Sequence, residues 1–183
     1  HASSGRLGAG SSVAFSGVSL LVWHHLNSTF ALHWRARTGT WRESHVNRVD
    51  LSPGKVGPPA RYNQPMVLMD GEAGGRLWNF YQENWEYQGP KYRHLLVRDT
   101  TQPLTFYHLN TEHSQGEANA EFRNVSGALR VLGFKGEGNY AQLWFADCAD
   151  VVLLGYGGNA SPFPYWCPYP PGYAQYRPSL VRL

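Results

Sequence analysis

The sequence predicts an all-β fold, a parallel β-helix, in which successive coils of the chain stack on one another. Short apolar runs alternate with turn residues along most of the chain, and a strand-turn-strand unit recurs about every 22–27 residues in the second half. A single unit of this length cannot bury its own apolar side chains. Consecutive units must therefore stack, with each strand pairing in parallel with its counterpart in the next coil.

The expected strands are short runs rich in apolar, β-branched and aromatic residues, bounded by Gly, Pro, Asn and Asp. They cover residues 18–23, 30–34, 66–69, 77–80, 94–97, 104–109, 129–134, 142–145 and 151–154. Gly and Pro leave few windows of about ten residues with the apolar periodicity of a helix. The sequence therefore predicts strands and turns without helices.

The repeat becomes visible when the sequence is slid along itself. Residues 122–134 align with residues 144–156 at an offset of 22, and both copies end on a Gly-aromatic pair. At an offset of 25, residues 97–104 align with residues 122–129. An antiparallel β-sandwich is the competing interpretation, because it also has short strands and frequent turns, but it predicts no stacking period of this kind.

The repeated unit reads as an apolar strand, an Asn or Asp, small polar residues, a second apolar strand and a Gly-aromatic pair. This pattern resembles the coils of pectin-lyase-like proteins, the right-handed parallel β-helices found in many polysaccharide lyases and glycoside hydrolases. The resemblance extends over roughly residues 12–183 and is clearest between 95 and 159. It implies a right-handed winding and a role in binding or processing polysaccharide, and it identifies the fold better than the activity.

The 183 residues are expected to form one domain. Residues 1–12 are predicted to be a flexible or edge segment, and residues 13–183 a single β-helix domain. Two loops are expected, one near 51–65 and one rich in Pro and aromatic residues near 160–178. Residues 178–183 look like a strand entering another coil, so further chain or self-association is expected at uncapped solenoid ends.

The charge distribution and the N-glycosylation sequons indicate which partners and which cellular location to expect. The net charge of +3 comes from scattered residues without a Lys or Arg cluster, which argues against a nucleic-acid partner. No apolar stretch approaches the ~18–20 residues of a membrane span. Three N-glycosylation sequons, at Asn27, Asn124 and Asn159, favour a secreted, extracellular glycoprotein.

The two cysteines, Cys148 and Cys167, are too few for a four-cysteine zinc site. Their spacing fits one disulfide that closes the Pro-rich loop, as is common in secreted proteins. Two unpaired buried thiols are the alternative.

Polar residues two apart on a strand point to the same side of it, so three polar rows stand out. The rows are His108, Asn110 and Glu112, followed by Glu117, Asn119 and Glu121, and then by Lys135, Glu137 and Asn139. Stacked coils could bring these rows together into one patch. The alternative is a set of solvent-facing polar residues whose ion pairs and Asn ladders hold the coils in register.

If the patch is functional, its residues divide by chemistry. The candidate acid, base or otherwise catalytic residues are His108, Glu117, Glu121, Lys135 and Glu137. Oxygen ligands for Ca²⁺ could come from Glu112, Glu117, Asn119 and Glu121. Arg123 or Arg130 could hold a substrate carboxylate, and Asn139 is a further candidate for substrate binding.

A second constellation is aromatic. Trp85 and Tyr87 lie in a polar stretch before Gly89, where exposed rings could cover the apolar face of a sugar. Core packing is the alternative for the aromatic residues around them.

Two functions remain open. In the first, the chain is a secreted carbohydrate-binding or polysaccharide-processing protein, a lyase or hydrolase. In the second, it is a non-catalytic structural glycoprotein module that assembles through stacking or packing of its β-helix.

Overall fold

The computed structural model describes residues 12–17, 19–23, 30–43, 45–49, 63–83, 89–114, 116–138, 140–158 and 179–183. These residues form twelve strands and include no helix, in agreement with the predicted all-β fold. All the strand pairs that they form are parallel. The part of the chain that is described offers no helix long and apolar enough to cross a membrane.

The strands build three faces of a solenoid. The first face consists of β3 (Leu32–Trp34), β6 (Val67–Asp70), β8 (Leu95–Thr100), the beginnings of β10 (Ala118–Gly138) and β11 (Ala141–Gly157), and β12 (Ser179–Arg182). The second face consists of β1 (Ser12–Ser16), β4 (Thr38–Arg42), the beginnings of β7 (Gly75–Glu83) and β9 (Leu104–Ser114), and the later parts of β10 and β11. The third face consists of β2 (Ser19–Trp23), β5 (His45–Val49) and the ends of β7, β9 and β10.

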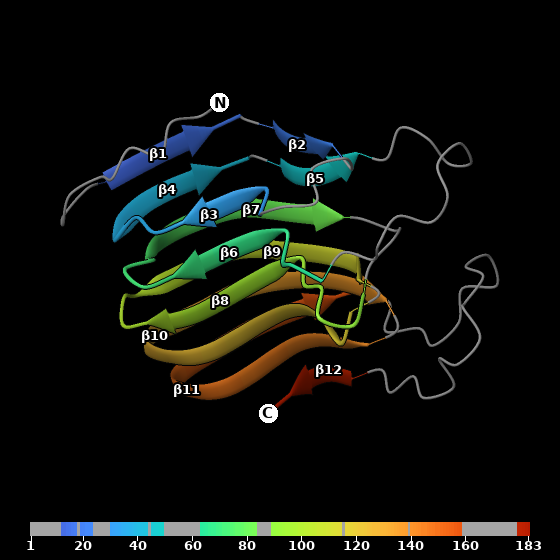
Figure 1. Ribbon diagram of the computed structural model, residues 1–183. Coiled ribbons are helices and arrows are strands. Elements are labelled where there is room, and N and C mark those ends of the chain that lie inside the picture. The colour runs from blue at the N-terminus through green and yellow to red at the C-terminus, as the bar shows by residue number, and fades with distance from the viewer. Residues whose placement is uncertain are drawn as a thin grey trace, which may run out of the picture.

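Figure 1 shows the coils stacked from the N-terminus at the top to the C-terminus at the bottom. Strands β6 and β8 run one way on the first face, and β7 runs the opposite way behind them. The chain is therefore a right-handed parallel β-helix, as predicted.

The strand register confirms most of the repeat and corrects part of it. Leu104 pairs with Leu129, and Phe134 pairs with Tyr156, as the offsets of 25 and 22 predict. Phe122, however, pairs with Phe145 rather than with the preceding Trp144. The difference arises because the register shifts between Val125 and Ala128, where β10 carries an additional residue.

The earlier coils are longer than the predicted 22–27 residues. Leu77 pairs with Phe106, 29 positions further along, and with Trp41, 36 positions before it. Additional chain between β5 and β6 lengthens this coil. Each expected strand overlaps an observed one, although the strand expected at 30–34 begins two residues before β3. Strands β1, β4 and β5 were not predicted, and the segment Thr-Gly-Thr-Trp-Arg of β4 has no apolar run.

A column of aromatic rings fills the interior along the solenoid axis. Its ring centroids are 5.2 Å apart between Trp41 and Phe80, and 5.1 Å apart between Phe122 and Phe145. Phe106 lies between these two pairs and is fully buried. Burial of each such ring contributes about 1.5–3 kcal/mol to folding, so this column is a main source of the stability of the stack.

Left-handed backbone forms the corner between the second and third faces. Glu43, Asn79 and His108 have φ values of 48°, 49° and 65°, and each follows a residue that is paired in register with its neighbours. Gly133 and Gly155 continue this corner in the next two coils, with φ of 82° and 76°. The left-handed residue turns the chain at the equivalent position of each of these coils. It also interrupts the alternation of side chains along the strand.

Several predictions concern residues that the structure does not describe. Residues 1–11, nearly all of the expected loop at 51–65 and the whole of the loop at 160–178 lie outside the described ranges. The strand expected near the C-terminus is present as β12, which pairs in parallel with β11.

Candidate functional site

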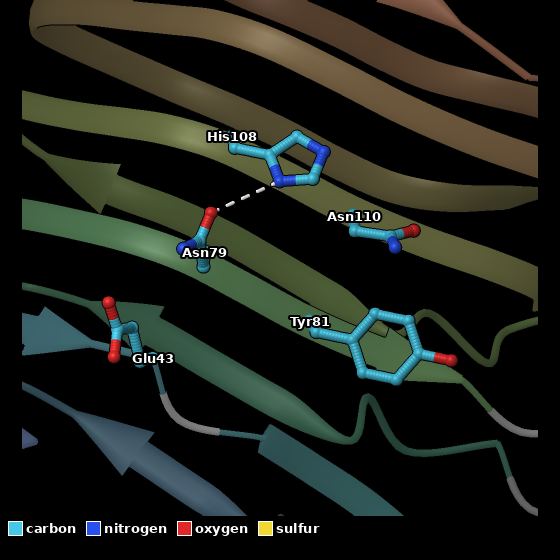
Figure 2. Close-up of a pocket in the computed structure, with 5 residues that line it drawn as sticks. All are labelled: Glu43, Asn79, Tyr81, His108 and Asn110. Atoms are coloured by element: carbon cyan, nitrogen blue, oxygen red, sulfur yellow. Dashed lines mark hydrogen bonds between the residues drawn. The ribbon is translucent and has the colours of Figure 1, made fainter. Parts of the chain in front are cut away.

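An open depression follows the corner between the second and third faces. Its lining residues are Glu43, Asn79, Tyr81, His108 and Asn110 (Figure 2). Three of them occupy the left-handed corner positions of successive coils, and Tyr81 pairs in register with Asn110. His108 Nδ1 lies 3.2 Å from Asn79 Oδ1, so one hydrogen bond links two coils across the depression. The side chains come from β7, β9 and the residue after β4, and they line the surface along the solenoid axis.

An aromatic strip borders this corner on the second face. Trp78 and Tyr107 immediately precede the corner residues, and their rings stack at 4.9 Å with an interplanar angle of 11°. The guanidinium of Arg42 lies over the Trp78 ring, 4.5 Å from its centroid. The Trp78 and Tyr107 rings are half-buried, and both residues are adjacent in sequence to residues that line the depression.

A cluster of charged side chains lies on the third face, two to four residues after the corner. Glu112 and Glu137 are register partners on β9 and β10. Lys135 Nζ donates to Glu112 Oε1 at 2.5 Å and lies 3.2 Å from Glu137 Oε1. Side-chain exposure is 8% for Glu112 and 26% for Glu137, so Glu137 is the more accessible carboxylate.

The position of Lys135 fixes its charge. Its hydrogen bond to Glu112 raises the pKa of the ammonium, and this effect exceeds the opposing effect of burial. Lys135 therefore stays protonated at neutral pH and acts on the two carboxylates as a cation, not as a base.

A β-bulge adds His113 to the cluster. Glu112 pairs with Glu137, but Ser114 pairs with the next residue, Gly138, so His113 is the additional residue of β9. Its φ of 64° lies in the left-handed region. The bulge breaks the alternation of the strand, so His113 and Glu112 lie on the same side although they are adjacent in sequence.

The imidazole thereby reaches both carboxylates. His113 Nε2 lies 3.4 Å from Glu137 Oε2, and Nδ1 lies 3.9 Å from Glu112 Oε2. One potential metal-ligand atom from each of Glu112, His113 and Glu137 falls within 4.8 Å of the others. The cluster thus combines two carboxylates, an imidazole and an ammonium, which are groups that can move a proton or stabilise a charge.

Two of the predicted Ca²⁺ ligands lie elsewhere. Glu117 and Glu121 are on the first face, where Arg93 Nη2 lies 3.1 Å from Glu117 Oε2 and Arg93 Nε lies 2.8 Å from Glu121 Oε2. Arg123 hydrogen-bonds to the other oxygen of Glu121. The carboxylate of Glu121 is buried and has both oxygens engaged, so it is part of an ion-pair network.

Asn119, the third member of that predicted row, is buried between two coils. Its Oδ1 accepts from Ser114 N at 3.1 Å, and its Nδ2 donates to Thr111 O at 2.9 Å and to Gln142 Oε1 at 2.7 Å. Asn119 and Gln142 also occupy equivalent places in successive coils, because the residues flanking them are paired in register. Asn119 therefore joins neighbouring coils through hydrogen bonds to backbone and side-chain groups.

The other predicted substrate-binding residues are dispersed. Arg130, on the second face, forms a two-pronged ion pair with Asp150, at 2.9 Å and 2.7 Å. This contact lowers the pKa of Asp150 and raises that of Arg130. Trp85, Tyr87 and Asn139 lie outside the described residues.

The predicted covalent features are described only in part. Cys148 is a free, half-buried thiol that lies 3.4 Å from the Phe122 carbonyl oxygen, and burial raises its pKa. Its predicted disulfide partner, Cys167, is outside the described ranges, as are the sequon residues Asn27 and Asn159. Asn124 is exposed and has a left-handed φ of 50° between the first and second faces, where its Nδ2 donates to Asp99 Oδ1 at 3.0 Å.

Two of the three predicted rows are therefore in register, and they lie beside residues that sequence reasoning missed. Asn110 pairs with Lys135, and Glu112 pairs with Glu137. The offset of 25 that relates Leu104 to Leu129 also relates Glu112 to Glu137, so extending that alignment would have matched the two carboxylates. Glu43, Asn79 and Tyr81 had no such signal, because longer coils separate them.

No protein-family model matches the chain, and neither a curated protein nor a solved structure matches it significantly. The class to which the structure assigns the chain is the parallel β-helix.

Proposed function

We propose that the chain is a secreted, pectin-lyase-like protein that binds a polysaccharide along the corner depression and cleaves it at the Glu112–Glu137 pair. The observation that carries the proposal is the bulge at His113, which adds an imidazole to two carboxylates that are already in register. Bulges are frequent next to active sites because they redirect side chains in this way.

The depression has the features that a sugar polymer requires. It follows the solenoid axis over several coils, so successive sugar units could contact equivalent positions of successive coils (Figure 2). Tyr81 supplies a ring, while Asn79 and Asn110 supply amides for hydroxyl groups. The Oδ1 atom of Asn110 has no hydrogen-bond partner in the structure, although it is buried. Such an atom is costly to leave unpaired, which supports recruitment of a donor.

The chemistry we assign follows from exposure and charge. Glu137 is the more exposed carboxylate and lies farther from the ammonium, so it is our candidate for direct proton transfer. Lys135 would offset negative charge at the reacting centre, and His113 would orient Glu137 or exchange a proton with it. Ca²⁺, if it binds, would act as an additional cation that offsets the charge of an acidic substrate.

The test uses the whole chain with pectate, alginate, a glycosaminoglycan and a neutral glucan, each with and without Ca²⁺. β-Elimination creates a conjugated double bond that absorbs in the ultraviolet, whereas hydrolysis creates reducing ends without that absorbance. Either signal supports cleavage and tells lyase from hydrolase. If neither signal appears on any polymer, the catalytic proposal is wrong.

A structural module is the second candidate, and a specific observation favours it. Lys135 already contacts both carboxylates, and Asn119 already joins neighbouring coils, as expected of residues that hold a solenoid in register. In that case, changing Glu137 would alter stability but no reaction, so the two candidates differ in a measurable way.

A further inference from the structure

Three arginines surround one indole on the first face. The guanidinium carbons of Arg182, Arg93 and Arg123 lie 4.2, 5.6 and 5.7 Å from the Trp144 ring centroid. Trp144 pairs in register with Glu121 on one side and with Arg182 on the other, so these three residues lie on three successive coils. Cation–π contacts of this kind fix the positions of otherwise flexible arginine side chains.

The arginines exceed the carboxylates available to neutralise them. Arg93 is buried against Glu117 and Glu121, and Arg123 shares Glu121. Among the described residues, Arg182 has no ion-pair partner, and its contact is with Trp144. The local sum is three guanidinium groups against two carboxylates.

A fourth arginine lies beside this group and has acidic partners of its own. Arg98 pairs in register with Arg123, so two like charges are adjacent on neighbouring strands. Their side chains are 46% and 53% exposed, and the nearest carboxylate oxygens to Arg98 are 3.8 Å away, on Asp70 and Asp99. Adjacent like charges destabilise a sheet unless an opposite charge lies between or above them.

A small side chain lies next to the indole on the same strand. Ala146 follows Trp144 by two residues, so both side chains point to the same side of β11, and Ala146 is the register partner of Arg123. Its side chain is a single methyl group, much shorter than the indole and the guanidinium beside it. A small anionic group could lie there and contact Arg123 and Arg182 together.

We propose that Arg123, Arg182 and Trp144, with Arg98 beside them, form a binding site for the carboxylate or sulfate groups of an acidic polysaccharide. The planar guanidinium group presents paired donors that match both kinds of anion. The indole is already engaged by guanidinium groups, which favours recognition through charge over stacking of a nucleic-acid base. This site is on a different face from the Glu112–Glu137 cluster, so it does not depend on catalysis there.

The experiment measures binding of the whole chain to immobilised polygalacturonate, heparin and neutral dextran at several salt concentrations. Arg182→Gln and Arg123→Gln should each weaken binding to an acidic polymer about tenfold, the equivalent of one charge-assisted hydrogen bond. Arg76→Gln is the matched control, because it removes an exposed arginine from the second face. Polygalacturonate and heparin separate carboxylate from sulfate recognition.

Three results would overturn the proposal. The first is equal binding by Arg182→Gln and Arg76→Gln. The second is binding to dextran as tight as binding to the acidic polymers. The third is binding of a single-stranded oligonucleotide that is as tight, at the same salt, and equally sensitive to Arg182→Gln, which would assign the surface to nucleic acid. Glu72→Gln, which removes an exposed carboxylate outside both sites, should bind as the wild type does. Because binding is measured without reference to cleavage products, failure of the cleavage proposal would leave this result interpretable.

Discussion

Glu112 and Glu137 face each other on adjacent strands, and the ammonium of Lys135 contacts both, at 2.5 Å and 3.2 Å. Without this cation, two carboxylates on neighbouring coils would repel each other, and the one on Glu112 is buried.

Lys135→Met should therefore destabilise the fold by about 1–3 kcal/mol at neutral pH, as the loss of a partner from a partly buried ion pair does. Chemical denaturation would measure this. Adding Glu137→Gln should restore part of the loss, because Glu112 no longer faces the carboxylate of Glu137. Lys91→Met, at an exposed turn, is the control. Equal stability of the Lys135 and Lys91 variants would show that the ammonium does not hold the cluster together.

Glu137→Gln should lower the turnover of any cleaved polysaccharide at least about a hundredfold, the usual effect of losing a general acid or base. The amide preserves the size of the side chain, so polymer affinity should change little. Initial rates and binding would be measured side by side. Glu72→Gln, which removes an exposed carboxylate at a turn, serves as control. A Glu137→Gln protein with unchanged turnover would exclude this carboxylate from the chemistry.

Substitutions at two glycines of β11, Gly155 and Gly157, should distinguish the effect of backbone strain from the effect of side-chain packing. Gly155 has a φ of 76°, and a Cβ there would meet its nearest atom, Gly133 Cα, at 3.8 Å, an ordinary contact distance. Gly155→Ala should therefore cost about 1–2 kcal/mol from the left-handed backbone alone. A Cβ on Gly157 would meet nothing within 4 Å, and Gly157→Ala should be neutral or stabilising by up to about 1 kcal/mol. Thermal unfolding distinguishes them, and equal midpoints would contradict the corner argument.

The Arg130–Asp150 ion pair should give an acid-dependent contribution to stability. Arg130 lowers the pKa of Asp150 below its ordinary 3.8 in the folded chain. Because the folded pKa is the lower one, the contribution is fully present above about pH 3.8 and is lost as pH falls through the folded pKa. The stability difference between wild type and Asp150→Asn should thus be constant above pH 4 and shrink toward pH 2.

Denaturation at each pH measures that difference. Asp147→Asn removes a charge from the same strand and is the matched control. A gap between wild type and Asp150→Asn that widens on acidification would have the wrong sign for this mechanism.

The fold was predictable from sequence because the later coils are nearly uniform in length. Equal spacing places Leu104 on Leu129 and Phe134 on Tyr156 without any structural information. The earlier coils were less predictable, since variable connections separate strands whose pairing depends on contacts distant in sequence. A single additional residue near Ser126 was enough to shift the predicted alignment of Phe122 by one position.

The site was predictable only where strand alternation holds. Asn110 and Glu112 align with Lys135 and Glu137 because both segments are regular up to the bulge. Asn119 looks like an exposed row member in sequence, yet backbone groups of neighbouring coils surround it. The acceptors that Arg93 finds in Glu117 and Glu121 also required tertiary structure, because the arginine lies more than twenty positions earlier in the chain.

At the corner between the second and third faces, the path of the backbone does not depend on which side chain is present. The corner position is occupied by Glu43, Asn79, His108 and Gly133 in successive coils, and all four have left-handed backbone. The strands on either side of the corner keep their pairing. A residue at one corner can therefore be exchanged for another that tolerates left-handed backbone without moving the adjoining coils. This independence would let the surface chemistry of the depression be varied one coil at a time, by combinatorial changes at positions 43, 79 and 108.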